Sequence, residues 1–156
     1  MQGDSRVIEF LNEVLSHELA AINQYFVDAK MCANWGLGGL ATWFREASME
    51  EMKDAEAVID RILYLEGLPN VQRVGAVRMG ENAGEKLRLA LEVEREAVTM
   101  FGRGIQVAND TGDHGTRQQL EEMLTGEEQH IDFLETEISL LDRLGEPLYL
   151  SSRLSG

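Results

Sequence analysis

Apolar residues recur at steps of three and four along four long stretches of the chain. This spacing places them on one face of an α-helix. The first stripe spans residues 7–29, the second 40–65, the third 87–105 and the fourth 120–141. The pattern predicts an all-α fold in which four amphipathic helices pack their apolar faces together as an antiparallel bundle.

Capping residues indicate where these helices begin. The first helix is expected to start near Asp4 or Ser5, because both residue types are good N-caps. The third is expected to open at Asn82 and the fourth at Thr116, since each is followed three residues later by Glu or Gln. That spacing is typical of a capping box.

Two short turns and one long connection are expected between the helices. Residues 34–36 and 110–112 each end in a glycine, which suits tight turns. Segment 67–81 contains three glycines and a proline and is typical of a loop. Extended, it reaches roughly 50 Å, more than the roughly 42 Å of a 28-residue helix, so it can cross the whole bundle. A short C-terminal helix is expected near Pro147.

All four apolar stripes are interrupted by acidic residues at mid-helix. These residues form two halves with one spacing, a Glu followed 33 residues later by a Glu-x-x-ligand pair. The halves are Glu18, Glu51 and Asp54, and Glu94, Glu127 and His130. In an antiparallel hairpin, residues equidistant from the turn lie at one level, so both halves present their acids at matching height.

This arrangement points to metal chemistry. Buried carboxylates are costly unless they are paired or bound to metal. The i, i+3 relation directs both members of each Glu-x-x-ligand pair to one helix face. Carboxylate and imidazole ligands suit iron or manganese and can also hold zinc. The spacing therefore predicts a site for two metal ions inside the bundle. The alternative is a structural bundle whose acids are solvated surface groups.

Composition narrows the class of protein. The chain has 156 residues, of which 44% are hydrophobic, which predicts a single domain over residues 1–156. The formal net charge of −14 argues against nucleic acid as a partner. We expect no membrane association, because no run approaches the roughly 20 apolar residues of a span. A lone cysteine and the absence of a secretory signal favour the cytoplasm.

Several segments of the chain resemble bacterioferritin, over nearly its whole length. The segments that carry the resemblance are residues 18–25, 34–37, 51–53, 62–70 and 127–132. The resemblance implies a ferritin-like bundle, with a long crossover between helices two and three, that assembles into a hollow cage of twenty-four subunits. It also implies ferroxidase activity, in which Fe(II) is oxidised by oxygen or peroxide and stored as ferric mineral.

The resemblance also assigns residues. It implies that two irons per subunit are held by Glu18, Glu51, Glu94, Glu127 and His130, with Glu51 and Glu127 bridging. It implies one haem b per subunit pair, with Met52 as the ligand from each subunit; without the resemblance, Met52 would be taken as core filler. Residues offered as neighbours of the haem are Ile22, Asn23, Phe26 and Met49.

Asp54 departs from the family pattern, which has His at this position. The Asp Oδ atoms lie the same number of bonds from Cα as His Nδ1, so Asp54 can reach the same metal. The ligand set then carries about five negative charges against four positive charges of two ferrous ions, which favours Fe(III) and slows its release. Crowding of like charges should also raise the carboxylate pKa values of the metal-free site. Alternatively, Asp54 marks a weakened ferroxidase site.

Other interpretations stay open. The chain could be a haem-bearing, ferroxidase-impaired subunit that assembles with an active second bacterioferritin subunit, or a small di-iron oxidase. A ferredoxin-type reductant is considered for iron release. Tyr25 could hydrogen-bond near the site or donate an electron, or be an ordinary core residue. Glu46 and Glu50 could bind iron but are expected to be solvated surface acids, and Cys32 is expected to be a buried small hydrophobe.

Overall fold

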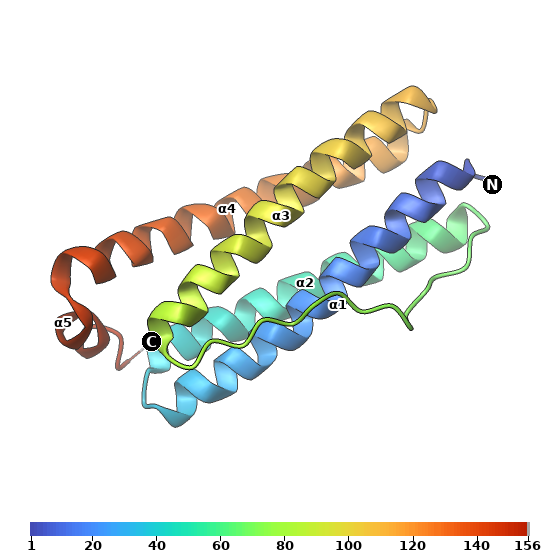
Figure 1. Cartoon of the computed structure of the whole chain (residues 1–156). Coiled ribbons are helices and arrows are strands. Elements are labelled where there is room, and N and C mark those ends of the chain that lie inside the picture. Colours follow the sequence, from blue (N-terminus) through green and yellow to red (C-terminus); the bar gives the residue numbers. More distant parts are fainter. Residues whose placement is uncertain (156) are drawn as a thin grey trace.

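The computed structural model describes residues 1–155 and is built of helices (Figure 1). Position 156, part of the predicted domain, lies outside the described range. No strand occurs within that range. The elements are α1 (Ser5–Asn34), α2 (Gly38–Tyr64), α3 (Ala83–Asp110), α4 (His114–Leu144) and the short α5 (Glu146–Ser151). The prediction of an all-α, four-helix bundle with a short C-terminal helix is confirmed.

Two helical hairpins make up the bundle. α1 turns into α2 at Gly36, and α3 turns into α4 at Gly112 (Figure 1). These glycines have φ of 79° and 73°, the left-handed region that residues with a Cβ rarely adopt. Both turns fall where the spacing of the acids predicts them, so each hairpin brings its two mid-helix glutamates to one level.

The long connection between α2 and α3 runs the length of the bundle beside α1 (Figure 1). Backbone N–H groups of this connection bond to α1 along its length. Asn70 N donates to Asn12 Oδ1 at 2.8 Å, and Arg78 N donates to Gln24 Oε1 at 3.0 Å. The connection brings the chain back to the end of the bundle at which α2 starts, and α3 starts there too. Helices α2 and α3 therefore run parallel, as predicted.

Helix starts follow their caps. Asp4 caps α1, where its carboxylate accepts from the N–H of Arg6 at 2.8 Å. Asn82 caps α3, where its Oδ1 accepts from the N–H of Glu85 at 2.9 Å. Pro147 lies in the first turn of α5, where its missing N–H costs nothing. These three starts agree with the sequence-based predictions.

The predicted start of α4 at Thr116 is wrong. The helix begins at His114 and Asp113 is its cap, with Asp113 Oδ1 accepting from the N–H of Thr116 at 3.0 Å. The same carboxylate forms an ion pair with Arg61 of α2, whose Nη2 lies 2.7 Å from Asp113 Oδ1. The cap is a local bond over three residues from Asp113, a preferred N-cap type, and the contact from Arg61 supports it.

The apolar core is divided into two clusters along the bundle. On every long helix one set of buried residues lies before the acids and the other lies after them. On α1, for example, Val7, Leu11 and Val14 belong to one cluster, and Tyr25 and Cys32 to the other. The acidic level therefore lies between two packed apolar layers, which screen it from both ends of the bundle. Within the described residues, no helix is long and apolar enough to cross a membrane.

Candidate metal centre

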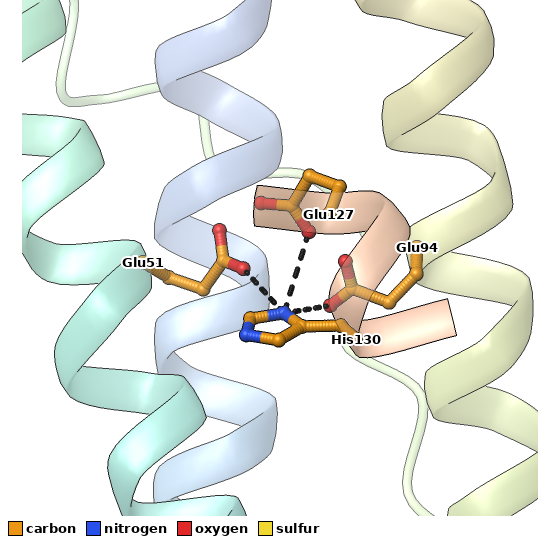
Figure 2. A group of neighbouring side chains, drawn as sticks. All are labelled: Glu51, Glu94, Glu127 and His130. Atoms are coloured by element: carbon orange, nitrogen blue, oxygen red, sulfur yellow. Dashed lines mark ion pairs between the residues drawn. The ribbon is translucent and has the colours of Figure 1, made fainter. Parts of the chain in front are cut away.

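Six side chains meet between the two apolar clusters. Glu51 comes from α2, Glu94 from α3, and Glu127 and His130 from α4 (Figure 2). Glu18 of α1 and Asp54 of α2 complete the cluster. The structure thus brings together every residue that the repeated 33-residue spacing singled out, and all four helices of the bundle contribute.

The cluster contains two overlapping groups, and within each group the candidate ligand atoms lie within 4.8 Å of one another. One group consists of Glu18, Glu51, Asp54 and Glu127, and the other of Glu51, Glu94, Glu127 and His130. The shared members are Glu51 and Glu127. A pair of carboxylates common to two groups is what two adjacent metal ions with bridging ligands require.

His130 points its Nδ1 into the carboxylates (Figure 2). This atom lies 3.6 Å from Glu51 Oε1, 3.4 Å from Glu94 Oε1 and 3.6 Å from Glu127 Oε2. These separations are long for hydrogen bonds. Two ligands that bind one ion at about 2.1 Å, with angles between 90° and 120°, lie roughly 3.0–3.6 Å apart. The separations therefore suit ligands of a common ion.

Burial leaves these polar atoms without protein partners. Glu18 is 0% exposed, and neither of its carboxylate oxygens has a hydrogen-bond partner. Glu51 Oε1, Glu94 Oε2 and His130 Nδ1 are buried and unpartnered in the same way. Among the ion pairs of the described residues, none joins a Lys or Arg to this cluster. Unpaired buried carboxylates are costly, so the donor set fits metal cations.

Titration of the metal-free cluster is shifted strongly. Burial raises the pKa of Glu18 well above its usual range, and the charge of Glu127 acts in the same direction. Burial and the charge of Glu18 raise the pKa of Glu51 likewise. Burial lowers the pKa of His130, but the neighbouring Glu127 and Glu50 more than offset this, so its pKa is raised overall. The crowding of like charges predicted from the sequence is present.

Asp54 lies near Glu18 and Glu51, at the edge of the cluster that is open to solvent. It is half-buried, and burial together with the charge of Glu127 raises the pKa of its carboxyl to about 7. Its carboxylate belongs to the group with Glu18, Glu51 and Glu127. Asp54 thus occupies the place in the first half that His130 occupies in the second.

Glu50 is exposed, as expected, but its carboxylate also has a protein partner. His130 Nε2–H donates to Glu50 Oε2 at 2.6 Å, although the Glu50 side chain is 58% exposed. This bond holds the ring so that Nδ1 faces the carboxylates. Glu50 precedes Asp54 by four residues, so the two side chains lie on one face of the helix. This spacing was the sequence signal that could have placed Glu50 near the cluster. Glu46 is exposed, as expected.

Aromatic side chains form the wall behind His130. The Trp43 ring stacks on Phe133 with centroids 4.5 Å apart, and its edge meets His130 at 5.6 Å. Tyr25 is fully buried and its hydroxyl donates to Glu94 Oε1 at 2.5 Å. Tyr25 therefore supports the position of one carboxylate, and Trp43, which sequence reasoning did not single out, supports the imidazole.

A surface pocket of about 280 Å³ opens beside the cluster between α2 and α4. Four acids, Glu50, Asp54, Glu122 and Glu127, line it together with Lys53 and His130. The pocket links solvent to the open edge of the centre. Its acidic lining attracts cations.

The residue offered for haem lies on the outside of the bundle. Met52 is 51% exposed on α2, and Met49 and Phe26 are also exposed. An exposed thioether on the outside of the bundle can reach a group shared with a second subunit. Cys32 is fully buried, as expected, and His114 is exposed.

The chain is similar to known proteins over nearly its whole length. A model of the ferritin-like domain matches residues 8–144. A bacterioferritin of Streptomyces coelicolor is 49% identical over 152 residues, which is 97% of this chain and 91% of that protein. A bacterioferritin of Rhodobacter capsulatus is 45% identical over 145 residues, 93% and 90% of the two chains. Bacterioferritin BfrA of Mycobacterium tuberculosis is 44% identical over 155 residues, 99% and 98% of the two chains.

Proposed function

The chain belongs to the bacterioferritin family, and we propose that it stores iron by oxidising Fe(II) at the centre described above. The observation that carries the proposal is the meeting of four buried glutamates, one half-buried aspartate and one histidine, to which no Lys or Arg of the described residues is paired. We further propose that residues 1–156 form one domain and that twenty-four copies assemble into a cage that holds the ferric mineral. A cytoplasmic location stays a prediction.

Each side chain has a proposed role. Glu18 and Asp54 bind one iron, and Glu94 and His130 bind the other, while Glu51 and Glu127 bridge the pair. The division follows the two overlapping groups of ligand atoms. The ligands carry about five negative charges once their protons leave, so they stabilise the ferric more than the ferrous pair.

Substrate and protons use the open edge of the centre. Fe(II) enters through the acidic pocket between α2 and α4, past Glu50 and Asp54. As iron binds, it displaces protons from carboxyls whose pKa values are raised in the metal-free protein. Two Fe(II) then supply two electrons, which with two protons reduce oxygen to hydrogen peroxide or reduce peroxide to two waters. The role of Tyr25 is to hold Glu94 in place through its hydroxyl.

A haem b shared by two subunits is proposed at Met52, whose exposed thioether would hold the group from each subunit. When bound, the haem supplies one-electron transfer, with a ferredoxin-type protein as the proposed reductant for iron release. Its binding is tested by Met52→Leu, which conserves volume but removes the sulfur. This variant should lose the haem absorption band and keep the size of the assembled particle.

Adjacent glutamates on α4 supply the test of iron oxidation. Glu127 is 2% exposed and belongs to both ligand groups, whereas Glu128 is exposed. In stopped-flow oxidation of a few Fe(II) per subunit, Glu127→Ala should lose the fast phase and Glu128→Ala should keep it. Equal rates in both variants and in the unmodified protein would refute the proposed centre.

Asp54 favours a second candidate function, a haem-bearing subunit of weak ferroxidase activity that assembles with an active subunit. Asp54→Ala and Asp54→His separate the two. If Asp54 is a working ligand, Asp54→Ala is slower than the unmodified protein, and Asp54→His restores or raises turnover. If the unmodified protein and Asp54→Ala share one slow rate and only Asp54→His is fast, the second function is correct. The mass of the particle in solution distinguishes a cage from a small di-iron oxidase.

A further inference from the structure

The two halves of the metal centre offer chemically different ligands. Glu51 and Glu127 are common to both groups, so the difference lies in the remaining pair of each. Glu18 and Asp54 make the first position all-oxygen, whereas Glu94 and His130 bring a nitrogen donor to the second. We call these the Asp54 position and the His130 position.

Ligand type controls which ion each position favours. Among divalent ions of the first transition row, affinity for a given site rises from manganese to iron, and selectivity is then modified by ligand type and geometry. Imidazole suits iron and the later metals, and carboxylate suits manganese. The advantage of Fe(II) over Mn²⁺ should therefore be smallest at the Asp54 position and larger at the His130 position.

The setting of the Asp54 position supports this preference. Glu18 is fully buried with both carboxylate oxygens unpartnered, which points to a cation at that place rather than to a protein contact. Asp54 is half-buried and faces the solvent pocket, so a weakly held divalent ion can be exchanged there. His130, in contrast, is held by Glu50 and by the edge of Trp43, which fixes its Nδ1 toward the carboxylates.

We propose that the Asp54 position accepts Mn²⁺ and that the chain forms a mixed manganese–iron centre, with iron at the His130 position, when both ions are present. This inference rests on the proposed function because it uses the same carboxylates. It adds manganese as a second metal bound at the centre and assigns the discrimination between Mn²⁺ and Fe(II) to one side chain, Asp54.

Position-resolved metal identity tests the proposal. Metal-free crystals of the full-length protein are soaked without oxygen in equal concentrations of Mn²⁺ and Fe(II), and anomalous scattering is recorded on both sides of the two absorption edges. The expected ratio of manganese to iron is at least about tenfold higher at the Asp54 position than at the His130 position. Tenfold is the smaller end of the change in affinity that even an outer-shell substitution causes at metal sites.

Asp54→His is the matched variant, because it makes the ligand types of the two positions alike. It should bring the two ratios to within a factor of about two and should lower the manganese retained by the protein after gel filtration, counted by its electron paramagnetic resonance signal. Asp54→Asn, which keeps the size and removes the charge, should lower manganese retention in the same way and serves if the His variant does not fold.

Each outcome has one meaning. Equal ratios at the two positions of the unmodified protein, or iron at both, overturn the mixed centre but leave the di-iron centre standing. Binding of neither ion inside the bundle overturns both this inference and the proposed function. Manganese confined to the Asp54 position, and lost in both Asp54 variants, supports the inference.

Discussion

Buried charges occur in two regions of this bundle, and the two regions neutralise them differently. At the proposed metal centre, Glu18 is fully buried and neither of its carboxylate oxygens has a hydrogen-bond partner. About three helical turns further along α1, Asp28 is also fully buried, but Lys86 Nζ of α3 lies 2.7 Å from its Oδ1. Lys86 is itself 0% exposed, and its Nζ also contacts Met31 Sδ at 3.2 Å.

The titration of the two carboxyls reflects this difference. Burial raises the pKa of Asp28, but its bond to Lys86 limits the pKa to about 6. Burial raises the pKa of Glu18 well above its usual range, and the nearby Glu127 adds to the increase. A buried acid with its own cation is therefore part of the fold, whereas a cluster of buried acids without one indicates a site for external cations.

Lys86→Met should produce the largest effect, because it leaves Asp28 buried without a cation. Breaking a buried ion pair by removing one partner costs about 3–5 kcal/mol. Urea unfolding of the metal-free protein should show this loss. The control is the double variant Lys86→Met with Asp28→Leu, which should be close to the unmodified protein. A single variant as stable as the double variant would contradict this account of the pair.

Glu18→Gln should change stability with opposite signs in the metal-free and metal-loaded protein. Without metal, the variant removes a crowded buried acid and should be more stable by about 1 kcal/mol. With metal at a hundred times its dissociation constant, the unmodified protein gains about 2.7 kcal/mol, and the variant should lose most of that gain. The measurement is the unfolding midpoint with and without anaerobic Fe(II).

Glu128→Gln, an exposed neighbour of the centre, is the control for the Glu18 variant and should leave both values unchanged. If Glu18→Gln keeps the full gain from metal, Glu18 is not a ligand. If the Glu18→Gln variant is less stable than the unmodified protein by several kcal/mol without metal, the Glu18 carboxylate has a protein partner that the structure lacks.

Stability of the metal-free protein should fall as pH rises from about 4 to above 7. The pKa of Asp54 is raised to about 7 in the folded state, so the folded chain keeps a proton that the unfolded chain has lost. Stability from such a group is complete below its unfolded pKa and is lost as pH rises through the folded pKa. Asp54 alone should contribute a fall of about 2 kcal/mol, after allowance for its partial exposure, and the raised pKa values of Glu18, Glu51 and Asp28 add to it.

Asp54→Asn should make this fall less steep between pH 6 and 7.5, roughly the range above the pKa of Asp28, while Glu18 and Glu51 still contribute to it. Asp28→Asn should lower the whole curve, because it leaves Lys86 buried without its anion, and should change the slope only below about pH 6. Metal loading should reverse the trend, because the ions bind the deprotonated carboxylates and bind them better as pH rises. Urea unfolding over a pH series, with and without metal, measures all three. A flat curve for the unmodified metal-free protein would contradict the raised pKa values.

Tyr25→Phe should have the smallest effect. Tyr25 lies between the two regions on α1, and the variant removes its hydroxyl donor to Glu94 while keeping the ring packed. A loss of about 1 kcal/mol is expected for one hydrogen bond. The affinity for metal should fall only modestly, because Glu94 keeps its place on α3. A loss comparable with that of Lys86→Met would mean that Tyr25 holds the region together rather than positioning one carboxylate.

Local pattern was sufficient for the helices and for the level of the acids. The helical period of apolar residues sets the inward face of each long helix, and the caps at Asp4 and Asn82 act through bonds within three residues. The equal spacing of Glu18 to Glu51 and Glu94 to Glu127 set their common height, because antiparallel hairpins count residues equally on both sides of a turn. Such features depend on neighbours in sequence, so the sequence determined them.

Contacts between helices were decided by the tertiary structure. Glu50 meets His130 across 80 residues, and Lys86 meets Asp28 across 58. Both depend on how each helix is rotated about its axis and offset along it. Those variables follow from packing of the whole bundle, and small changes in them move a side chain from solvent to a partner. The same packing left Glu18 without a hydrogen-bond partner, which favours the proposed metal centre over a second buried ion pair.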